Sequence, residues 1–225
     1  TLEERRHEVE LVEVETEGDR VRDELIHRLG KTGAFVRSLD EQVLDGTVDA
    51  AVHSMKDMPT EMPDDLVVAG VPERAPAGDV LVTPEGTHLA GLDSGAVVGT
   101  SSLRRKAELL AEREDLTVEP LRGNVDTRVE KLLAPTLQRE HEHLVDAVED
   151  EDDDTTDDDV DAWFNDLSEV ERRALERDTE VEYDAIVLAE AGLERAGLLH
   201  HLDYQRLPVR THVPAPGQVA MAVTA

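Results

Sequence analysis

Residues 49–59 read DAAVHSMKDMP, a run of small and β-prone residues that gives way to charged ones. The pattern predicts a short buried strand that ends at His53 and Ser54. Pro59 cannot continue a strand ladder, and it favours an extended backbone at Met58. The stretch is therefore interpreted as a strand followed by a loop, the local unit of an α/β fold.

The predicted loop holds two opposite charges next to each other, Lys56 and Asp57. Ligands bind outside the carboxyl ends of strands in α/β sheets, so these charges occupy a favourable place for a site. In the functional interpretation, Asp57 takes part in proton chemistry and Lys56 holds an anion. The alternative is a solvated loop whose ion pair contributes little to stability.

The chain is long enough for one large domain or two small ones, with 225 residues. It carries 53 acidic and 23 basic residues, which give a net charge of −30. This charge disfavours nucleic acid and anionic membranes as partners, because phosphate binding needs a positive surface. Only four of the cations are lysines. An acidic, lysine-poor surface is typical of cytoplasmic proteins from organisms that keep high intracellular salt.

Cysteine is absent from the 225 residues, which excludes disulfides, thiolate metal ligands and cysteine nucleophiles within them. No apolar run approaches the length of a membrane-spanning helix, so none is predicted. Thr1 and the charged residues after it form neither a start nor a signal peptide. We expect the sequence to begin inside a longer gene.

Hydrophobic periodicity predicts alternating strands and helices that form parallel βαβ units. The predicted helices are 34–44, 103–114, 125–133 and 191–199, with Ser101 or Ser102 and then Asn124 as N-caps. The predicted strands are 8–16, 49–54, 66–71, 79–83, 95–100, 116–121, 183–188 and 219–223. Stretches rich in proline and glycine at 72–78 and 211–218 predict two α/β lobes, one of residues 1–74 and 212–225 and one of residues 75–211.

Residues 134–180 are interpreted as an insertion in the second lobe. Eleven of the sixteen residues from Asp146 to Asp161 are acidic, which is typical of a disordered or solvated segment. The apolar residues that follow, from Trp163 to Leu175, indicate a short amphipathic helix. Metal binding by the acidic run is the minor alternative, because the run lacks the spaced ligands and glycine of a calcium loop.

Five arginines lie at or just beyond the carboxyl ends of predicted strands: Arg104, Arg105, Arg122, Arg128 and Arg195. Arg128 and Arg195 are expected in the first turns of the helices that follow. Several open a helix, where the helix dipole disfavours a cation unless an anion binds there too. For any single arginine, a local ion pair is the preferred explanation. Arg104 would pair with Glu108, and Arg122 or Arg128 with Glu130 or another neighbouring acid. Five arginines on one edge of a sheet favour a shared site for an anionic ligand.

Long motifs in this chain resemble those of the porphobilinogen deaminase family, also called hydroxymethylbilane synthase. AVHSMKDMP, VVGTSSLRRKAEL, LRGNVDTR, YDAIVLAEAGLERAG and PAPGQ occur in the family's order, and TEGD and GKTGAFVRSLDEQVLDG fit its upstream pattern. With its acidic composition, the chain is similar to a halophilic archaeal member. The resemblance implies two lobes similar to type II periplasmic binding proteins with the active site between them, followed by a third α+β domain.

The function that the resemblance implies is that of a transferase in tetrapyrrole and heme biosynthesis. The family condenses four porphobilinogen molecules into a linear tetrapyrrole and releases ammonia at each step. The product grows on a dipyrromethane cofactor, which is bound covalently to a cysteine of the third domain. We expect a monomer whose partner is the small-molecule substrate, with no metal.

The resemblance also assigns roles to individual residues. Asp57 matches the catalytic aspartate, which would bond pyrrole N–H groups and stabilise the cation left by ammonia. His53, Ser54 and Gln218 would shape the loop or hinge, although a satisfied buried histidine explains His53 equally well. Binding of the cofactor and of substrate carboxylates is implied for Lys56, Thr100, Ser101, Ser102, Arg104, Arg105, Arg122, Gly123, Asn124, Arg128 and Arg195.

The chain departs from the family pattern in four places. It starts after the family's first strand, and Val219 stands where the family usually has glycine. The acidic insertion replaces a short turn, and the sequence stops where the cysteine-bearing third domain should begin. We therefore expect either an enzyme completed by further segments or, as the alternative, a non-catalytic two-lobed anion-binding remnant.

Overall fold

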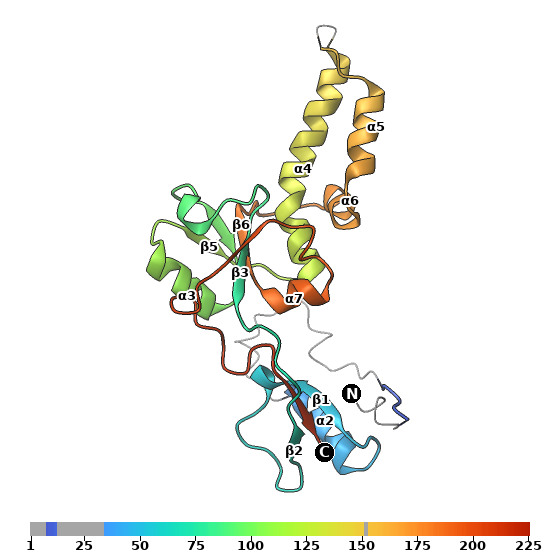
Figure 1. Cartoon of the computed structure of the whole chain (residues 1–225), viewed down its shortest axis with the longest axis vertical. Coiled ribbons are helices and arrows are strands. Elements are labelled where there is room, and N and C mark those ends of the chain that lie inside the picture. Colours follow the sequence, from blue (N-terminus) through green and yellow to red (C-terminus); the bar gives the residue numbers. More distant parts are fainter. Residues whose placement is uncertain (1–7, 13–33, 151–152) are drawn as a thin grey trace. The chain divides into compact units, whose positions relative to one another are not determined.

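The computed structural model describes residues 8–12, 34–150 and 153–225 (Figure 1). The chain divides into two compact units. One contains the residues up to Ala75 together with Pro216–Ala225, and the other contains Pro76–Ala215. The predicted strand at 8–16 lies outside the described residues from residue 13 onward.

The first unit contains a small antiparallel sheet with the strand order β1-β8-β2. Its strands are β1 (Ala51–Ser54), β2 (Val68–Gly70) and β8 (Met221–Thr224), and helix α2 (Ala34–Leu44) precedes them, all close to their predicted positions. The expectation of parallel strands is wrong in this unit. A short alternating strand shows the same pattern in either direction, so its pairing depends on how β8 returns from the far end of the chain.

The prediction of a strand at 8–16 is wrong for residues 8–12, the part that the structure describes. Residues 8–12 form no strand, and Leu11 is 92% exposed. Alternation tells which face of a strand would be apolar, but the strand forms only where a neighbour supplies hydrogen bonds. None of the described strands pairs with this segment.

The second unit contains a five-stranded mixed sheet with the order β5-β4-β6-β3-β7. The strands are β3 (Asp79–Val82), β4 (Val97–Gly99), β5 (Thr117–Glu119), β6 (Ala185–Ala189) and β7 (Tyr204–Arg206). As predicted, β4 is parallel to β5 and β6, but β3 runs antiparallel to β6 and β7. The carboxyl ends of β4, β5 and β6 therefore share an edge with the amino end of β3.

Both faces of this sheet are covered around β3 and β6, which explains why these two strands are almost entirely buried. Val80 and Val82 of β3 pack in one core cluster, to which helices α4 (Val125–Glu149), α6 (Glu169–Leu175) and α7 (Glu190–Arg195) contribute. Leu81, between them, packs in the other cluster with Leu109 of α3 (Leu103–Glu112). Strand β7 was not predicted, because its sequence Tyr-Gln-Arg has no apolar run.

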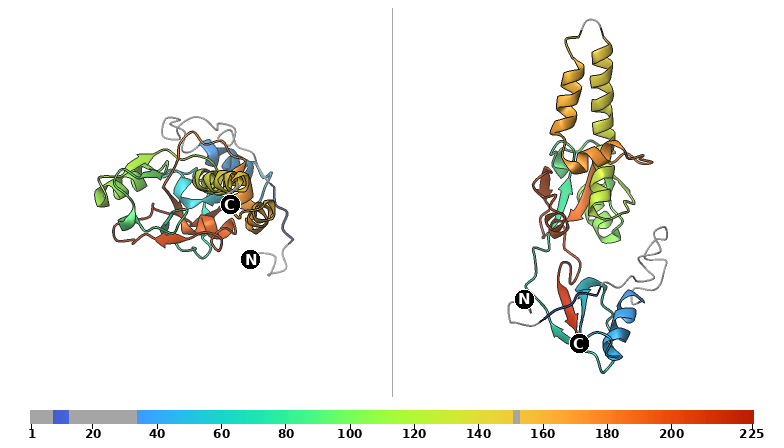
Figure 2. Two further views of the ribbon diagram at one scale, coloured as in Figure 1. Left: turned by 90° about the horizontal axis from the view of Figure 1, so that it is seen from above. Right: turned by 90° about the vertical axis from the view of Figure 1, so that its right-hand side faces the viewer.

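For the acidic run, the disordered alternative is wrong for the described residues, because helices hold most of them, whereas their exposure agrees with the solvated alternative. Helix α4 continues to Glu149, and α5 (Asp157–Asp166) runs beside it, as both views in Figure 2 show. The reason is that Leu137 extends the apolar face of α4, against which Val170 and Ala174 of α6 are buried. The acidic side chains lie on the exposed faces, and capping boxes begin α5 and α6. The short helix predicted between Trp163 and Leu175 is present as the end of α5 and as α6 (Glu169–Leu175).

Candidate functional site

The loop after β1 presents the predicted charge pair to solvent. The chain makes a single 3₁₀ turn over Met55–Asp57 and then becomes extended at Met58, as expected for a residue before proline. The Nζ atom of Lys56 lies 4.0 Å from the Oδ2 atom of Asp57, and the two side chains are 50% and 54% exposed. Such an open pair contributes little to stability, so both groups remain accessible to a ligand.

A buried polar cluster fixes the start of this loop. The Nε2 atom of His53 lies 3.0 Å from the hydroxyl of Thr224 and 3.2 Å from a carboxylate oxygen of Asp40. Burial raises the pKa of Asp40, and the nearby His53 opposes that shift. These contacts join β1, β8 and α2, so the strand that leads into the Lys56–Asp57 loop is held by two other elements.

The PAPGQ motif lies against the same loop. Gly217 has a φ of +68°, and a Cβ atom at this position would come within 3.1 Å of the Lys56 amide nitrogen. Only glycine therefore allows this approach. The next residue, Gln218, is buried, and its carbonyl accepts a hydrogen bond of 2.8 Å from Nε of Arg74. Two motifs far apart in the sequence thus meet in one unit.

In the second unit, the polar residues after β4 mainly organise the backbone. Ser102 caps α3 by accepting from the Arg105 amide at 3.4 Å, as predicted for one of the two serines. The Ser101 hydroxyl donates to the Leu121 carbonyl at 2.6 Å. Buried Thr100 accepts from the Ser102 amide at 3.2 Å. The three side chains therefore fix the turn between β4 and α3, which positions Arg104 and Arg105.

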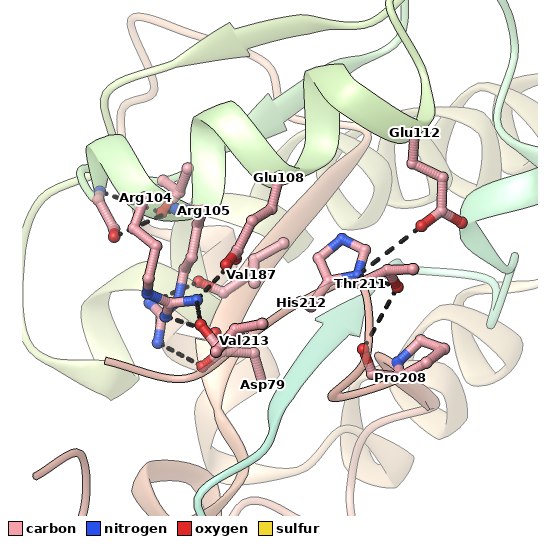
Figure 3. A network of polar contacts seen from close by, with 12 residues as sticks. Asp79, Arg104, Arg105, Glu108, Glu112, Val187, Pro208, Thr211, His212 and Val213 are labelled. Atoms are coloured by element: carbon pink, nitrogen blue, oxygen red, sulfur yellow. Dashed lines mark hydrogen bonds and ion pairs between the residues drawn. The ribbon is translucent and has the colours of Figure 1, made fainter. Parts of the chain in front are cut away.

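Arg104 and Arg105 converge on a single buried carboxylate, that of Asp79 (Figure 3). Each guanidinium lies 2.7 Å from a different oxygen of Asp79, whose side chain is 1% exposed. Arg104 also donates to Glu108 at 2.7 Å and to the Val213 carbonyl at 2.6 Å. The pairing with Glu108 that sequence spacing suggested is thus present, together with a second partner that spacing did not suggest.

Arg128 lies near the same group. Its Nε donates to the Gly123 carbonyl at 2.8 Å, and burial followed by the charge of Arg105 lowers its pKa. The Nε atom of Arg105 is buried without a hydrogen-bond partner. Arg105 and Arg128 are thus two neighbouring, partly buried guanidiniums, and Nε of Arg105 lacks a hydrogen-bond acceptor. A bound anion would stabilise this arrangement.

The remaining predicted residues follow β5 and β6. Asn124 caps α4 by accepting from the Thr127 amide at 2.8 Å, as predicted. Gly123 has a φ of +116°, and a Cβ there would lie 2.5 Å from a Thr127 methyl, so no other residue fits. The half-buried Arg122 precedes them.

Arg195 lies in the last turn of α7 and not in its first turns, because α7 ends at this residue. Its side chain is exposed, and its Nε donates to the Ala191 carbonyl at 3.0 Å. The suggested pairing of Arg122 or Arg128 with Glu130 is not what the structure shows, since Glu130 binds Arg173 and Arg177 from the α6 region. The shared partner Asp79 and the charge of Arg105 near Arg128 join Arg104, Arg105 and Arg128 into one cluster.

Asp79 is the residue that sequence reasoning missed. Its only signal is an acidic residue at the head of an otherwise apolar and fully buried strand. Within the described ranges, no group of three or more histidine, aspartate or glutamate side chains is arranged to hold a metal ion. No helix in that same part of the chain has the length and apolarity to cross a membrane.

The fold and these residues define a mixed α/β protein with a cluster of arginines at one sheet edge and an accessible aspartate on a strand-end loop. The family model described as "Porphobilinogen deaminase, dipyromethane cofactor binding domain" matches residues 1–143 and 167–225. The chain therefore belongs to the porphobilinogen deaminase family.

Curated relatives support this membership. The chain is 53% identical over 266 aligned positions to a probable porphobilinogen deaminase of Halobacterium salinarum, which covers 100% of this chain and 67% of the relative. It is 37% identical to a probable porphobilinogen deaminase of Methanococcoides burtonii, over 99% of this chain and 56% of that protein. A porphobilinogen deaminase of Exiguobacterium is 36% identical, over 96% of this chain and 56% of that protein. The chain thus spans between about half and two-thirds of these relatives.

The family match leaves out residues 144–166. This stretch contains the last six residues of α4, which ends at Glu149, and the whole of α5. The parts of α4 and α6 that form the buried contact lie within the match. The helical extension beyond them is therefore specific to this chain relative to the family model.

Proposed function

We propose that this chain is the catalytic part of a hydroxymethylbilane synthase, which condenses four porphobilinogen molecules stepwise into a linear tetrapyrrole on a dipyrromethane primer. Family membership supports the class of reaction. The observation that carries the proposal is the Arg105–Arg128 pair, because two partly buried cations with an unsatisfied donor call for an anionic ligand. Porphobilinogen supplies that charge through its acetate and propionate groups.

Asp57 is assigned the proton chemistry. In each step the C–N bond of the aminomethyl group breaks, ammonia leaves, and a cationic azafulvene remains. The α-carbon of the terminal pyrrole then forms a C–C bond to the methylene carbon and loses its proton. A carboxylate that accepts hydrogen bonds from pyrrole N–H groups stabilises the cation and can relay the proton. The half-exposed carboxylate of Asp57, on a loop fixed by β8 and α2, is suited to this role.

The cations bind the carboxylates and so orient the pyrrole rings. Arginine can hold a carboxylate with two parallel hydrogen bonds, which makes it selective for this group. In a chain of net charge −30, a cluster of cations also concentrates an anionic substrate. We assign this binding to Lys56, Arg104, Arg105, Arg122, Arg128 and Arg195.

The same donors fit a dipyrromethane cofactor, which carries carboxylates of the same kind. When bound, the cofactor supplies the terminal pyrrole to which each new unit is joined. The unsatisfied Nε of Arg105 and the nearby Arg128 are suited to one of its carboxylates. A thioether link to the cofactor would have to come from outside these 225 residues, since they contain no cysteine.

The test is the substitution Asp57→Asn in the full-length protein. We expect kcat for porphobilinogen consumption to fall by about 100-fold or more, the usual scale for a lost acid–base group. The fold should persist, because the Asp57 side chain is 54% exposed and its ion pair with Lys56 is long. Initial rates of product formation and circular dichroism measure the two effects.

The matched control is Asp64→Asn, which removes an exposed aspartate from the same unit. We expect the Asp64 variant to keep its turnover. Near-normal turnover of Asp57→Asn would remove Asp57 from the proposed role. A wild-type protein that binds porphobilinogen without releasing ammonia would instead identify the non-catalytic remnant.

A further inference from the structure

Asp79 is a buried carboxylate that neither the family match nor the sequence pattern assigns to a function. We infer that it is a positioning residue, which holds Arg104 and Arg105 in the orientation that receives a carboxylate of the substrate. This inference rests on the proposed function, because it concerns the same arginines. The inference adds Asp79 to the proposed site, as a residue that acts on the ligand through the two arginines.

Helix geometry shows why the two arginines need a common partner. Arg104 and Arg105 are consecutive on α3, and consecutive helical residues do not face each other. Left to themselves, their side chains would leave the helix about 100° apart. Each binds a different oxygen of Asp79 at 2.7 Å, so this one carboxylate brings the two guanidiniums together (Figure 3).

Asp79 is itself held firmly. It is the first residue of β3, which lies between β6 and β7, and it pairs with Ala189, the last residue of β6. Its carbonyl accepts a hydrogen bond of 2.9 Å from the Leu207 amide, and the carbonyl before it accepts from the Glu190 amide at 3.1 Å. The carboxylate is therefore fixed by the sheet, which makes it a rigid support for side chains that must meet a ligand.

The contacts of Asp79 also act on the charges of the arginines. Arg104 binds the carboxylates of Asp79 and Glu108, Arg105 binds Asp79, and the charge of Arg105 acts on nearby Arg128. Asp79 offsets the unfavourable position of two cations in the first turn of a helix. It thus permits Arg104 and Arg105 to lie close together.

The experiment compares Asp79→Asn with Asp115→Asn in the full-length protein. Asp115 is the matched control, because Arg113 holds it at 2.8 Å through two nitrogens in the same unit, away from the cluster. Asparagine keeps the size of the side chain and removes its charge. We expect Asp79→Asn to raise KM for porphobilinogen about tenfold, the effect of weakening one charge-assisted contact, with a smaller change in kcat. Asp115→Asn should leave both constants unchanged.

A second readout is independent of turnover. Phenylglyoxal modifies accessible guanidiniums, and peptide mass spectrometry reports the rate at each arginine. We expect severalfold faster modification of Arg104 and Arg105 in Asp79→Asn, with no change at these arginines in Asp115→Asn. If the wild-type protein does not consume porphobilinogen, the proposed function fails, and this measurement still decides the role of Asp79.

Asp79→Glu is the control for a folding defect. It keeps the negative charge but moves the carboxylate by one methylene, so the protein should fold and KM should still rise. Unchanged KM and unchanged arginine reactivity in Asp79→Asn would overturn the inference. So would an equal loss of activity in the Asp79 and Asp115 variants, because a purely structural contribution explains that result.

Discussion

Val219 has a backbone φ of +66°, in the left-handed region that β-branched residues rarely adopt. It follows Gly217 and Gln218 in the PAPGQ motif, at the position where the resemblance to the family implies glycine. A side chain in this conformation costs roughly 1–2 kcal/mol per residue. The local chain is therefore strained next to the loop that carries Lys56 and Asp57.

We predict that Val219→Gly stabilises the protein by about 1 kcal/mol, because relief of the strain outweighs the extra freedom of glycine in the unfolded chain. Urea unfolding at constant KCl concentration measures the change. Val209→Gly is the control, since Val209 is 58% exposed and its φ is not positive, so this variant should be destabilised. Equal destabilisation of the two variants would show that Val219 carries no strain.

Single residues also show how far the candidate site could be predicted. Lys56 and Asp57 were recognisable because a strand, a loop and a proline mark their place locally. Pairing of Arg104 with Glu108 was recognisable from its helical spacing. Asp79 could not be found in this way, because it lies 25 residues from Arg104 in the sequence and meets it only through the sheet.

At the scale of elements, α4 and α6 show how a charge-rich sequence can still form a packed structure. Glu130 of α4 is buried, and Arg177 binds it at 2.9 Å through Nε. The Gln138 side chain donates to the carbonyls of Leu175 and Arg177 at 3.1 and 3.0 Å. These contacts and the apolar face of α4 lie outside residues 144–166, the stretch that the family model does not match.

We predict that a short glycine–serine linker can replace residues 144–166 without unfolding the protein. The main loss is the partial burial of Trp163, so stability should fall by no more than about 2 kcal/mol. Thermal unfolding and circular dichroism measure this effect. Porphobilinogen turnover by the full-length protein should persist.

Glu130→Gln provides the comparison for this deletion. It changes a single atom but leaves Arg177 beside a neutral group, so we expect a larger loss of about 3 kcal/mol. If the deletion destabilises the protein more than Glu130→Gln does, the helical extension is part of the core and the assignment of its boundaries fails.

At the scale of the whole molecule, the net charge of −30 is the main electrostatic influence on stability. Acidic side chains outnumber basic ones by 53 to 23, so they repel one another in the compact state. Salt shortens the range of this repulsion to roughly 3 Å at 1 M. Stability should therefore depend on salt more than on any single ion pair.

We predict that the melting temperature rises steadily between low and multimolar KCl. Differential scanning calorimetry at a series of KCl concentrations measures the rise. An uncharged osmolyte at matched osmolality is the control, because it does not screen charge and should raise the melting temperature less. A melting temperature that is the same in low and in multimolar KCl would contradict this account.

The sequence by itself determined the local features: most strands and helices, the caps at Ser102 and Asn124, the extended Met58 and the family. Periodicity, capping and proline geometry act over a few residues, so short windows contain them. Only the tertiary structure decided the direction of β3, the course of α4 past Pro135, and the partners of His53, Gly217 and Arg104. Those outcomes depend on which distant segments meet in a sheet or on a helix face, and no local pattern specifies that choice.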